Sequence, residues 1–154
     1  MEKTNVSRLL DINGINYEMH EYNEEITDGQ EVAKLIGKNS ETVFKTLVTV
    51  VGVKDYRVFV IPVSFTLDLK KAAKGAGVKS VEMLRQKELL PLTGYVHGGC
   101  SPIGMKKPFK TYIDETAILC DTICVSAGKK GKQIEISPIK LKDFIGAEFK
   151  DLTQ

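Results

Sequence analysis

The chain has 154 residues, 42% hydrophobic and 27% charged, with a formal net charge of +2. These totals are typical of one globular domain with a real core, so we expect residues 1–154 to form a single domain. The weak positive charge argues against a dedicated nucleic-acid binder, and any contact with nucleic acid should be local. No apolar run approaches the roughly 20 residues that span a membrane. The start of the chain lacks a signal-peptide pattern, and three cysteines without framework spacing are typical of a reducing compartment, so we predict a cytoplasmic protein.

The N-terminal part of the chain predicts a helix, a strand and a second helix. Thr4 precedes apolar residues at helical spacing, and Gly14 closes that helix. The alternation of side chains in residues 16–22 predicts a strand. Asp28 is a capping residue for the second helix, which ends at Gly37.

The most apolar stretch, residues 42–53, predicts a buried central strand, because it is β-branched and apolar on both faces. Residues 56–63 are its expected partner after a short turn. Lys45 lies inside the central strand, on the same face as Val43 and Leu47. A buried ammonium is costly unless it has a partner or faces a cleft. Lys45 is therefore either a functional group on a cleft wall or a strand-end lysine whose head reaches water.

Two further helices are expected after the strand pair. Asp68 caps one over residues 69–77, and Ser80 caps another over residues 81–90 that stops near Pro91. The chain then predicts strands and a final helix: strands over residues 111–119, 122–127 and 133–136, and a helix between Ser137 and Gly146. Helices and strands interleave irregularly, so we expect a mixed sheet that curls, with helices packed outside it.

The segment between the fourth helix and the next strand, residues 94–107, reads GYVHGGCSPIGMKK. Gly98 and Gly99 allow a ligand to approach the main chain closely. Pro102 fixes its own φ and pushes Ser101 toward extended geometry. The composition indicates a shaped loop whose backbone N–H groups hold a polar ligand; the alternative is a simple turn.

The histidines and cysteines do not form a recognisable metal motif. A zinc site needs closely spaced ligands such as CxxC or HxxxH, and neither occurs, so we predict no metal and no other cofactor. His97, beside the paired glycines, is either a substrate-binding or a structural histidine. Cys100 is a candidate nucleophile, but a catalytic thiol needs a base and an orienting group that the sequence does not reveal. Cys120 and Cys124 are expected to be strand or core residues.

Two short basic clusters are candidate phosphate contacts. A phosphate-binding P-loop reads GxxxxGK[ST]. Gly94 and Gly99 have the glycine spacing of this pattern, but Cys100 stands where the lysine should be. The turn GKKGKQ does not match the pattern either. Lysine contacts to phosphates need no sequence code, so these clusters are either a partial footprint for a phosphate backbone or solvated surface. Their members are Lys129, Lys130 and Lys132 in one cluster and Lys106, Lys107 and Lys110 in the other.

Several blocks, taken in order, cover almost the whole chain and carry a resemblance. They are residues 20–22 (HEY), 29–32 (GQEV), 43–47 (VFKTL), 67–71 (LDLKK), 94–104 (GYVHGGCSPIG) and 125–131 (VSAGKKG). The chain resembles the YbaK-type aminoacyl-tRNA deacylases, relatives of the editing domain inserted in bacterial prolyl-tRNA synthetases. Each block alone is weak, whereas the ordered set is highly specific.

The resemblance implies an α/β fold with a curled, mixed, largely antiparallel and barrel-like sheet surrounded by helices. The essential lysine of the family falls on Lys45, and its GxxxP loop falls on residues 98–102. Its early tyrosine falls on Tyr22. Its acidic residue after the basic turn falls on Gln133, which is a departure; either the amide suffices or nearby Glu135 takes that role. The position of Cys100 is apolar in relatives, which argues against a thiol nucleophile.

The activity that the resemblance implies is hydrolysis of a mischarged aminoacyl ester, typically Cys-tRNA(Pro), in trans and without a cofactor. The acceptor end of tRNA(Pro) is the expected partner, and prolyl-tRNA synthetase is a candidate one. Cysteine, alanine and serine remain open as the amino acid removed. The alternatives are a non-catalytic module that binds the tRNA end or the synthetase, and a small-molecule ester or amide hydrolase, for which no GxSxG motif is present.

Overall fold

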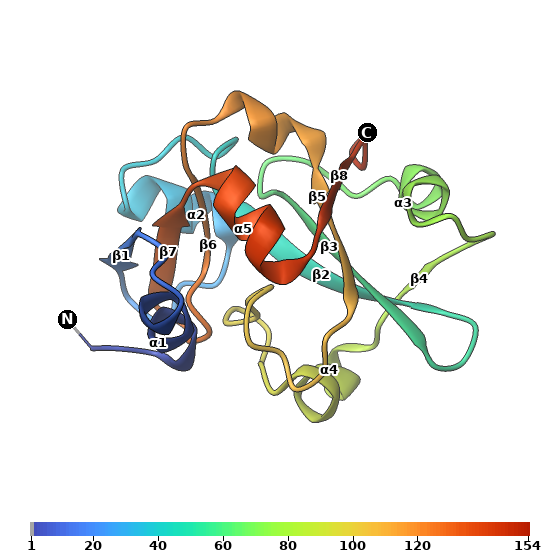
Figure 1. Ribbon diagram of the computed structural model, residues 1–154, viewed down its shortest axis with the longest axis horizontal. Coiled ribbons are helices and arrows are strands. Elements are labelled where there is room, and N and C mark those ends of the chain that lie inside the picture. Colours follow the sequence, from blue (N-terminus) through green and yellow to red (C-terminus); the bar gives the residue numbers. More distant parts are fainter. Residues whose placement is uncertain (1) are drawn as a thin grey trace.

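The computed structural model describes residues 2–154, in which helices and strands are interleaved along the chain (Figure 1). The helical elements are α1 (Asn5–Ile12), α2 (Gly29–Leu35), α3 (Leu69–Ala76), α4 (Gln86–Thr93), the 3₁₀ helix η1 (Glu115–Leu119) and α5 (Pro138–Ile145). The strands are β1 (Tyr17–Glu21), β2 (Phe44–Val51), β3 (Asp55–Pro62), β4 (Glu82–Met83), β5 (Lys110–Asp114), β6 (Ile123–Ser126), β7 (Lys132–Ile136) and β8 (Glu148–Lys150). Within this described part, no helix has the length and apolar character to cross a membrane.

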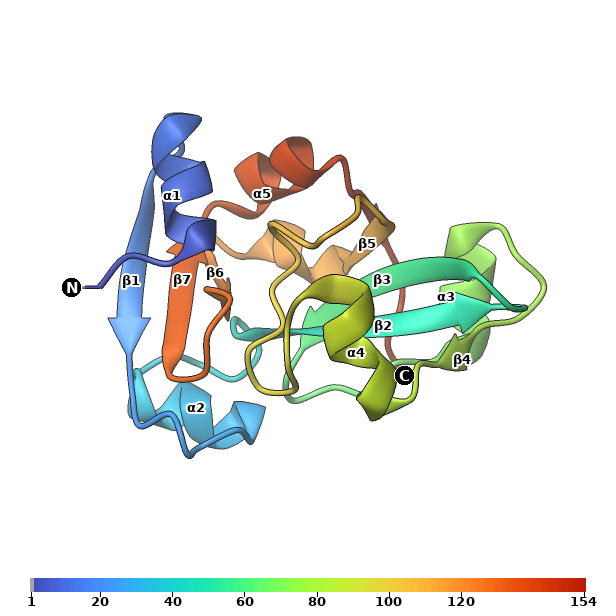
Figure 2. The same ribbon diagram turned by 90° about the horizontal axis from the view of Figure 1, so that it is seen from below.

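The strands form two sheets (Figure 2). The smaller sheet has the order β1-β7-β6 and is antiparallel throughout. The larger has the order β4-β2-β3-β5-β8, antiparallel from β4 to β3 and parallel from β3 to β8. The sheets meet at one isolated bridge between Val43 and Cys124, where the Cys124 N–H donates to the Thr42 carbonyl at 2.9 Å.

The expected barrel-like sheet is therefore wrong, although the mixed α/β class and the helices around the sheets are confirmed. A barrel needs a continuous hydrogen-bonded ladder at every strand junction. Here a single bridge replaces the ladder between β2 and β6, so the two sheets remain separate.

The predicted central strand pair is confirmed as the β2–β3 hairpin. Its register runs from Phe44 opposite Pro62 to Val51 opposite Asp55. In Figure 2 this hairpin projects away from the smaller sheet, with α4 lying across it. The start of β2, where Lys45 lies, is the end of the hairpin closest to the smaller sheet, because the bridge at Val43 precedes it directly.

Buried apolar side chains form three clusters. The largest joins α1, α5 and the inner faces of both sheets, and a second packs α3 against the opposite face of the larger sheet. The third is small and places α2 over the junction of the sheets, through Ala33, Val43, Val63 and Cys124. Helix α2 is thus fixed at the point where β2 and β6 meet.

Three local expectations need correction. The helix predicted over residues 81–90 begins only at Gln86, because Glu82 and Met83 pair with β2, and it continues through Pro91 to Thr93. The strand predicted over residues 111–119 ends at Asp114, whose side chain accepts from the Thr116 N–H and caps η1 instead. Strand β8 was not predicted; it is three residues long, and its pairing with β5 is a tertiary contact.

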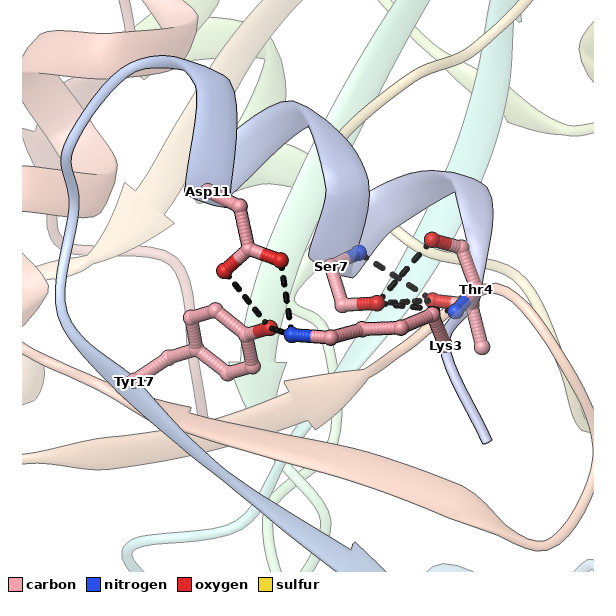
Figure 3. Close-up of polar contacts among 5 residues, drawn as sticks. All are labelled: Lys3, Thr4, Ser7, Asp11 and Tyr17. Carbon is pink, nitrogen blue, oxygen red and sulfur yellow. Dashed lines mark hydrogen bonds and ion pairs between the residues drawn. The ribbon is translucent and has the colours of Figure 1, made fainter. Parts of the chain in front are cut away.

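The first helix begins as predicted and is tied to β1 (Figure 3). Thr4 caps α1 by accepting from the Ser7 N–H at 3.1 Å, while the Ser7 hydroxyl oxygen accepts from the Thr4 N–H. The Lys3 ammonium lies 2.7 Å from Asp11 and donates to the Tyr17 hydroxyl at 2.9 Å. These exposed contacts fix the entry of the chain onto the edge strand of the smaller sheet.

Candidate functional site

A cleft of about 360 Å³ opens where the start of β2, the start of α2 and the loop after α4 converge on the ends of β6 and β7. Its apolar lining comes mostly from α2, β2 and the residue after β3. Its polar and glycine lining consists of Tyr22, Thr27, Asp28, Gly29, Lys45, Thr46, His97, Gly98, Ser126 and Gln133. The cleft therefore gathers residues that are more than 100 positions apart in the sequence.

Lys45 lies on the wall of this cleft. It stands opposite Ile61 in the β2–β3 register, and its side chain is partly buried between apolar neighbours. Its ammonium forms no ion pair or hydrogen bond with any residue between 2 and 154. An unpaired ammonium on a cleft wall is suited to a polar or anionic ligand, because such a ligand offsets the desolvation of the cation.

The loop after α4 contributes Gly98 and Cys100 to the cleft. Gly98 adopts φ +88°, and a Cβ there would lie 2.8 Å from Thr27 Cγ2. Both the positive φ and the close contact with Thr27 therefore require glycine at this position. The amides of Gly98 and Cys100 donate no hydrogen bond within the described chain. Two backbone donors are thus available where the loop meets the cleft.

Gly99 does not line the cleft, although its neighbours Gly98 and Cys100 do. Its N–H donates to the Val96 carbonyl at 3.0 Å, and a Cβ at this position would lie 3.0 Å from the backbone nitrogen of Lys130. Gly99 is buried, and its glycine is needed for contact with the basic turn, not for contact with a ligand in the cleft.

Ser101 and Pro102 are both buried within the loop. The Ser101 hydroxyl accepts from the Ile103 N–H at 3.2 Å, and Pro102 lines a separate hollow beside Phe144. Neither residue lines the cleft, so both act on the shape of the loop. His97, by contrast, is exposed and lies in the cleft lining.

Gln133 faces the cleft from β7, where it pairs with His20 on one side and Ser126 on the other. Its side chain is deeply buried, since the residue is only 7% exposed, and its Oε1 accepts no hydrogen bond in the described chain. Tyr22, directly after β1, also lines the cleft, and its N–H donates to the Gly131 carbonyl at 2.9 Å.

Glu135, the alternative to Gln133, belongs to a separate ion-pair cluster. Its carboxylate accepts from Thr122 and lies 2.8 Å from His20 Nε2 and 3.0 Å from Lys38 Nζ. The Thr122 hydroxyl, together with His20 and Lys38, lowers the pKa of Glu135 to about 2, although partial burial opposes that shift. Glu135 does not line the cleft, so of the two residues only Gln133 faces it.

His20, Cys124 and Glu135 are the one group in residues 2–154 whose ligand atoms are close enough for a metal, all within 4.8 Å. The Lys38 ammonium already occupies the same Glu135 oxygen that His20 contacts. Burial raises the pKa of the Cys124 thiol to about 12, which disfavours the thiolate that a metal requires. This donor set is an ion-pair cluster that fastens the end of α2 to the smaller sheet, and it suits a metal poorly.

The lysines of the basic turn differ in their availability. Lys129 is paired with Glu2 and Lys132 with Glu21, each at 3.0 Å. Lys130 has no ion pair in the described chain, and its stem lies beside Gly98. In the second cluster, Lys106 donates to the Pro91 carbonyl at 3.4 Å, while Lys107 and Lys110 are exposed.

Cys100 lines the cleft as a neutral thiol. Burial raises its pKa to about 12, and its Sγ makes no hydrogen bond with any described residue. A thiol with neither a lowered pKa nor a base is a poor nucleophile.

Sequence reasoning did not identify Thr46, Ser126 or the start of α2 as cleft residues. Gly29 was noted only as part of the resemblance; a Cβ there would lie 2.4 Å from Val63 Cγ1, so this glycine lets α2 close over the cleft floor. Such contacts leave no periodic signal in the sequence.

Comparison with known proteins gives consistent results. The sequence pattern that defines the aminoacyl-tRNA editing domain matches residues 23–144. A protein of Enterococcus faecalis provisionally named Cys-tRNA(Pro)/Cys-tRNA(Cys) deacylase EbsC is 44% identical over 154 residues, covering 99% of this chain and 94% of the relative. Among solved structures, one provisionally described as a trans-editing enzyme for prolyl-tRNA synthetase is 25% identical with a TM-score of 0.86, covering 99% of each chain. The hypothetical protein APE2540 shares the fold at 23% identity, with a TM-score of 0.89 over 97% of this chain and 99% of its own.

Proposed function

Because the chain belongs to the aminoacyl-tRNA editing domain family, we propose that it deacylates mischarged Cys-tRNA(Pro) in trans. The observation that carries this proposal is the cleft, whose lining combines an unpaired lysine and two free loop amides with apolar residues. The name of the E. faecalis relative supports cysteinyl-tRNA as the substrate, and the name of the trans-editing enzyme supports action outside the synthetase.

The proposed chemistry is stabilisation of charge at an ester that is already reactive. Positioning and preorganised donors account for most of the rate in such a reaction. The N–H groups of Gly98 and Cys100 donate to the ester carbonyl oxygen as it gains negative charge. The Lys45 ammonium holds the terminal ribose or its phosphate, so that the carbonyl stays against the loop. Gly99, Ser101 and Pro102 hold the loop in shape.

We propose the substrate thiol as the attacking group for a cysteinyl ester. The sulfur bonds to the carbonyl carbon, the carbon–oxygen bond to the ribose breaks, and the thiol proton passes to the ribose oxygen. Water then opens the resulting thiolactone to free cysteine. The Cys100 thiol takes no part in this step, because burial raises its pKa to about 12; only the backbone N–H of Cys100 contacts the substrate.

Editing of this kind has a physical reason. A synthetase pocket for a small side chain discriminates against a near-isostere by only about 1–3 kcal/mol, so a second hydrolytic site is needed to remove the errors. The cleft has a volume of about 360 Å³ and is lined partly by valines. This size admits a small amino acid but only part of the terminal adenosine. The rest of the tRNA acceptor end then lies outside, beside the Lys130 side of the loop.

The cellular setting follows from the proposed substrate. We expect residues 1–154 to act as one editing domain in the cytoplasm, with no cofactor. Prolyl-tRNA synthetase is the proposed docking partner, since it releases the mischarged product. Co-elution of the protein with the synthetase, in the presence and absence of tRNA(Pro), tests that partnership.

The decisive experiment is single-turnover hydrolysis of a panel: Cys-tRNA(Pro), Cys-tRNA(Cys), Ala-tRNA(Pro), Ser-tRNA(Pro) and Pro-tRNA(Pro). We expect the cysteinyl esters to be cleaved at least about tenfold faster than the seryl ester, a difference of about 1.4 kcal/mol, because serine has the same shape without the thiol. Equal rates for Cys and Ser esters contradict the thiol-assisted step. Tight binding of the panel without release of any amino acid contradicts the enzyme and favours a non-catalytic tRNA-end module.

A further inference from the structure

Buried polar atoms without partners cluster at the cleft. In residues 2–154, three buried side-chain oxygens lack a hydrogen bond: Thr46 Oγ1, Ser64 Oγ and Gln133 Oε1. Thr46 and Gln133 both line the cleft, whereas Ser64 does not. An unsatisfied buried polar atom costs about 1–3 kcal/mol, and native structures contain few of them. Their concentration here indicates that a ligand supplies the missing partner.

No group in residues 2–154 donates a hydrogen bond to Gln133 Oε1. The flanking strands hold its backbone in register with His20 and Ser126, and the side chain is more than nine-tenths buried. The nearest hydroxyl in register, Ser126 Oγ, accepts from the Gly128 N–H at 3.1 Å and makes no hydrogen bond to Gln133 Oε1. The side chain of His20 is engaged with Glu135. The terminal amide of Gln133 is therefore kept in place for something outside the chain.

The chemistry of the cleft identifies the ligand group. Lys45 and the loop amides are donors, and they suit the carbonyl and phosphate oxygens of the substrate. Gln133 Oε1 is an acceptor without a donor, and the Thr46 hydroxyl can accept as well as donate, so both can bind a donor on the substrate. An aminoacyl ester has one cationic donor close to its carbonyl, the α-ammonium group.

We infer that Gln133, assisted by Thr46, binds the α-amino group of the aminoacyl ester and makes the cleft selective for esters whose α-amine is free. This inference rests on the proposed deacylase function and adds a subsite to it. An N-acylated ester, such as a peptidyl or formylated one, keeps only one N–H donor, has no positive charge and brings a bulky group against the buried amide, so it is rejected.

The neutral amide has a further consequence. An α-amino group titrates at about pH 7.7–8.0 in peptides, and an amide oxygen accepts from its charged and neutral forms alike. The KM of the natural protein should therefore change little between pH 6.5 and 9. A carboxylate at the same place attracts the charged form more strongly, so Gln133→Glu should have a low KM at pH 6.5 that rises at pH 9.

The test compares two esters on tRNA(Pro): cysteinyl, and 3-mercaptopropionyl, which lacks only the α-amine. Gln133→Leu should raise KM for the cysteinyl ester by about 5- to 150-fold, the range that a lost buried hydrogen bond of about 1–3 kcal/mol gives. It should leave KM for the 3-mercaptopropionyl ester unchanged. Thr46→Val gives a second variant of nearly equal volume with the same expected pattern. Ser64→Ala removes the third unpaired hydroxyl, outside the cleft, and should change neither constant.

Distinct results overturn the inference. Equal losses on both esters mean that Gln133 is structural, and a Glu variant as poor as the Leu variant means that the amide acts as a donor. If the natural protein hydrolyses neither ester, the proposed function fails instead. Binding of 3′-cysteinylamino-adenosine and its des-amino counterpart, measured by calorimetry, then tests the α-amine subsite without turnover; equal affinities refute it.

Discussion

Replacing Lys45 tests whether its ammonium group is catalytic or structural. Its ammonium has no ion pair or hydrogen bond within residues 2–154, so removing it leaves no protein group unsatisfied. The structural effect is limited to its partly buried stem. At about 0.8 kcal/mol per fully buried methylene, a stem of this kind contributes about 1 kcal/mol, and relief of the desolvated charge offsets part of that. We expect Lys45→Ala to melt within about 2–4 °C of the natural protein.

The kinetic effect should be far larger. Loss of one preorganised group at a reacting centre typically lowers the rate about 10²- to 10³-fold, or about 2.7–4 kcal/mol. The assay is single-turnover hydrolysis of Cys-tRNA(Pro) beside a thermal melt. Lys45→Met keeps the stem and should lose the same activity with a smaller change in stability.

Lys54→Ala is the matched control. It removes an exposed lysine in the turn at the far end of the same hairpin, beyond Val51, which is six positions and so about 20 Å along the strand from Lys45. It should change neither rate nor stability. A Lys45→Ala protein that melts normally and hydrolyses within about threefold of the natural protein, an effect of about 0.65 kcal/mol, would remove Lys45 from the mechanism.

Three other predictions concern the loop, the basic turn and the ion-pair cluster. Cys100→Ala should keep its rate within about threefold, and the thiol should resist iodoacetamide at pH 8, because its pKa is about 12; rapid alkylation, or an inactive but folded variant, contradicts this. Lys130→Ala should lower the salt slope of tRNA binding by up to about one unit in fluorescence anisotropy, while Lys129→Ala and Lys132→Ala should lower it less, because each of these is already ion-paired; equal effects of all three place the tRNA differently. Since the pKa of Glu135 is lowered from 4.5 to about 2, its contribution is fully present above about pH 4.5 and is lost as the pH falls toward 2. That contribution to the free energy of unfolding has an upper bound of about 3 kcal/mol and is about 1–2 kcal/mol after solvent screening. Glu135→Gln should therefore flatten this part of the stability–pH curve in urea titrations. An unchanged curve would refute the assignment of Glu135 to a stabilising ion-pair cluster.

The sequence by itself determined the local elements and the chemistry-bearing segments. Caps such as Thr4 and Asp28 and the apolar run of β2 are local signals, because capping and strand burial depend on residues close in sequence. The glycine loop was recognisable for the same reason, since its composition suits neither helix nor strand. Lys45 stood out because a charge within a buried strand has few explanations.

The tertiary structure alone decided which of these residues face the cleft. Gly98 and Gly99 look equivalent in the sequence, yet one faces the cleft and the other packs on the basic turn. Gln133 and Glu135 lie two positions apart on one strand, and only the placement of Lys38 and Thr122 assigns Glu135 to an ion-pair cluster. Local sequence signals also could not predict which strands pair, because β3 pairs with β5 and β5 with β8 across long connections. Such contacts join segments distant in sequence, and their free energy comes from burial and hydrogen bonds that exist only once the sheets have assembled.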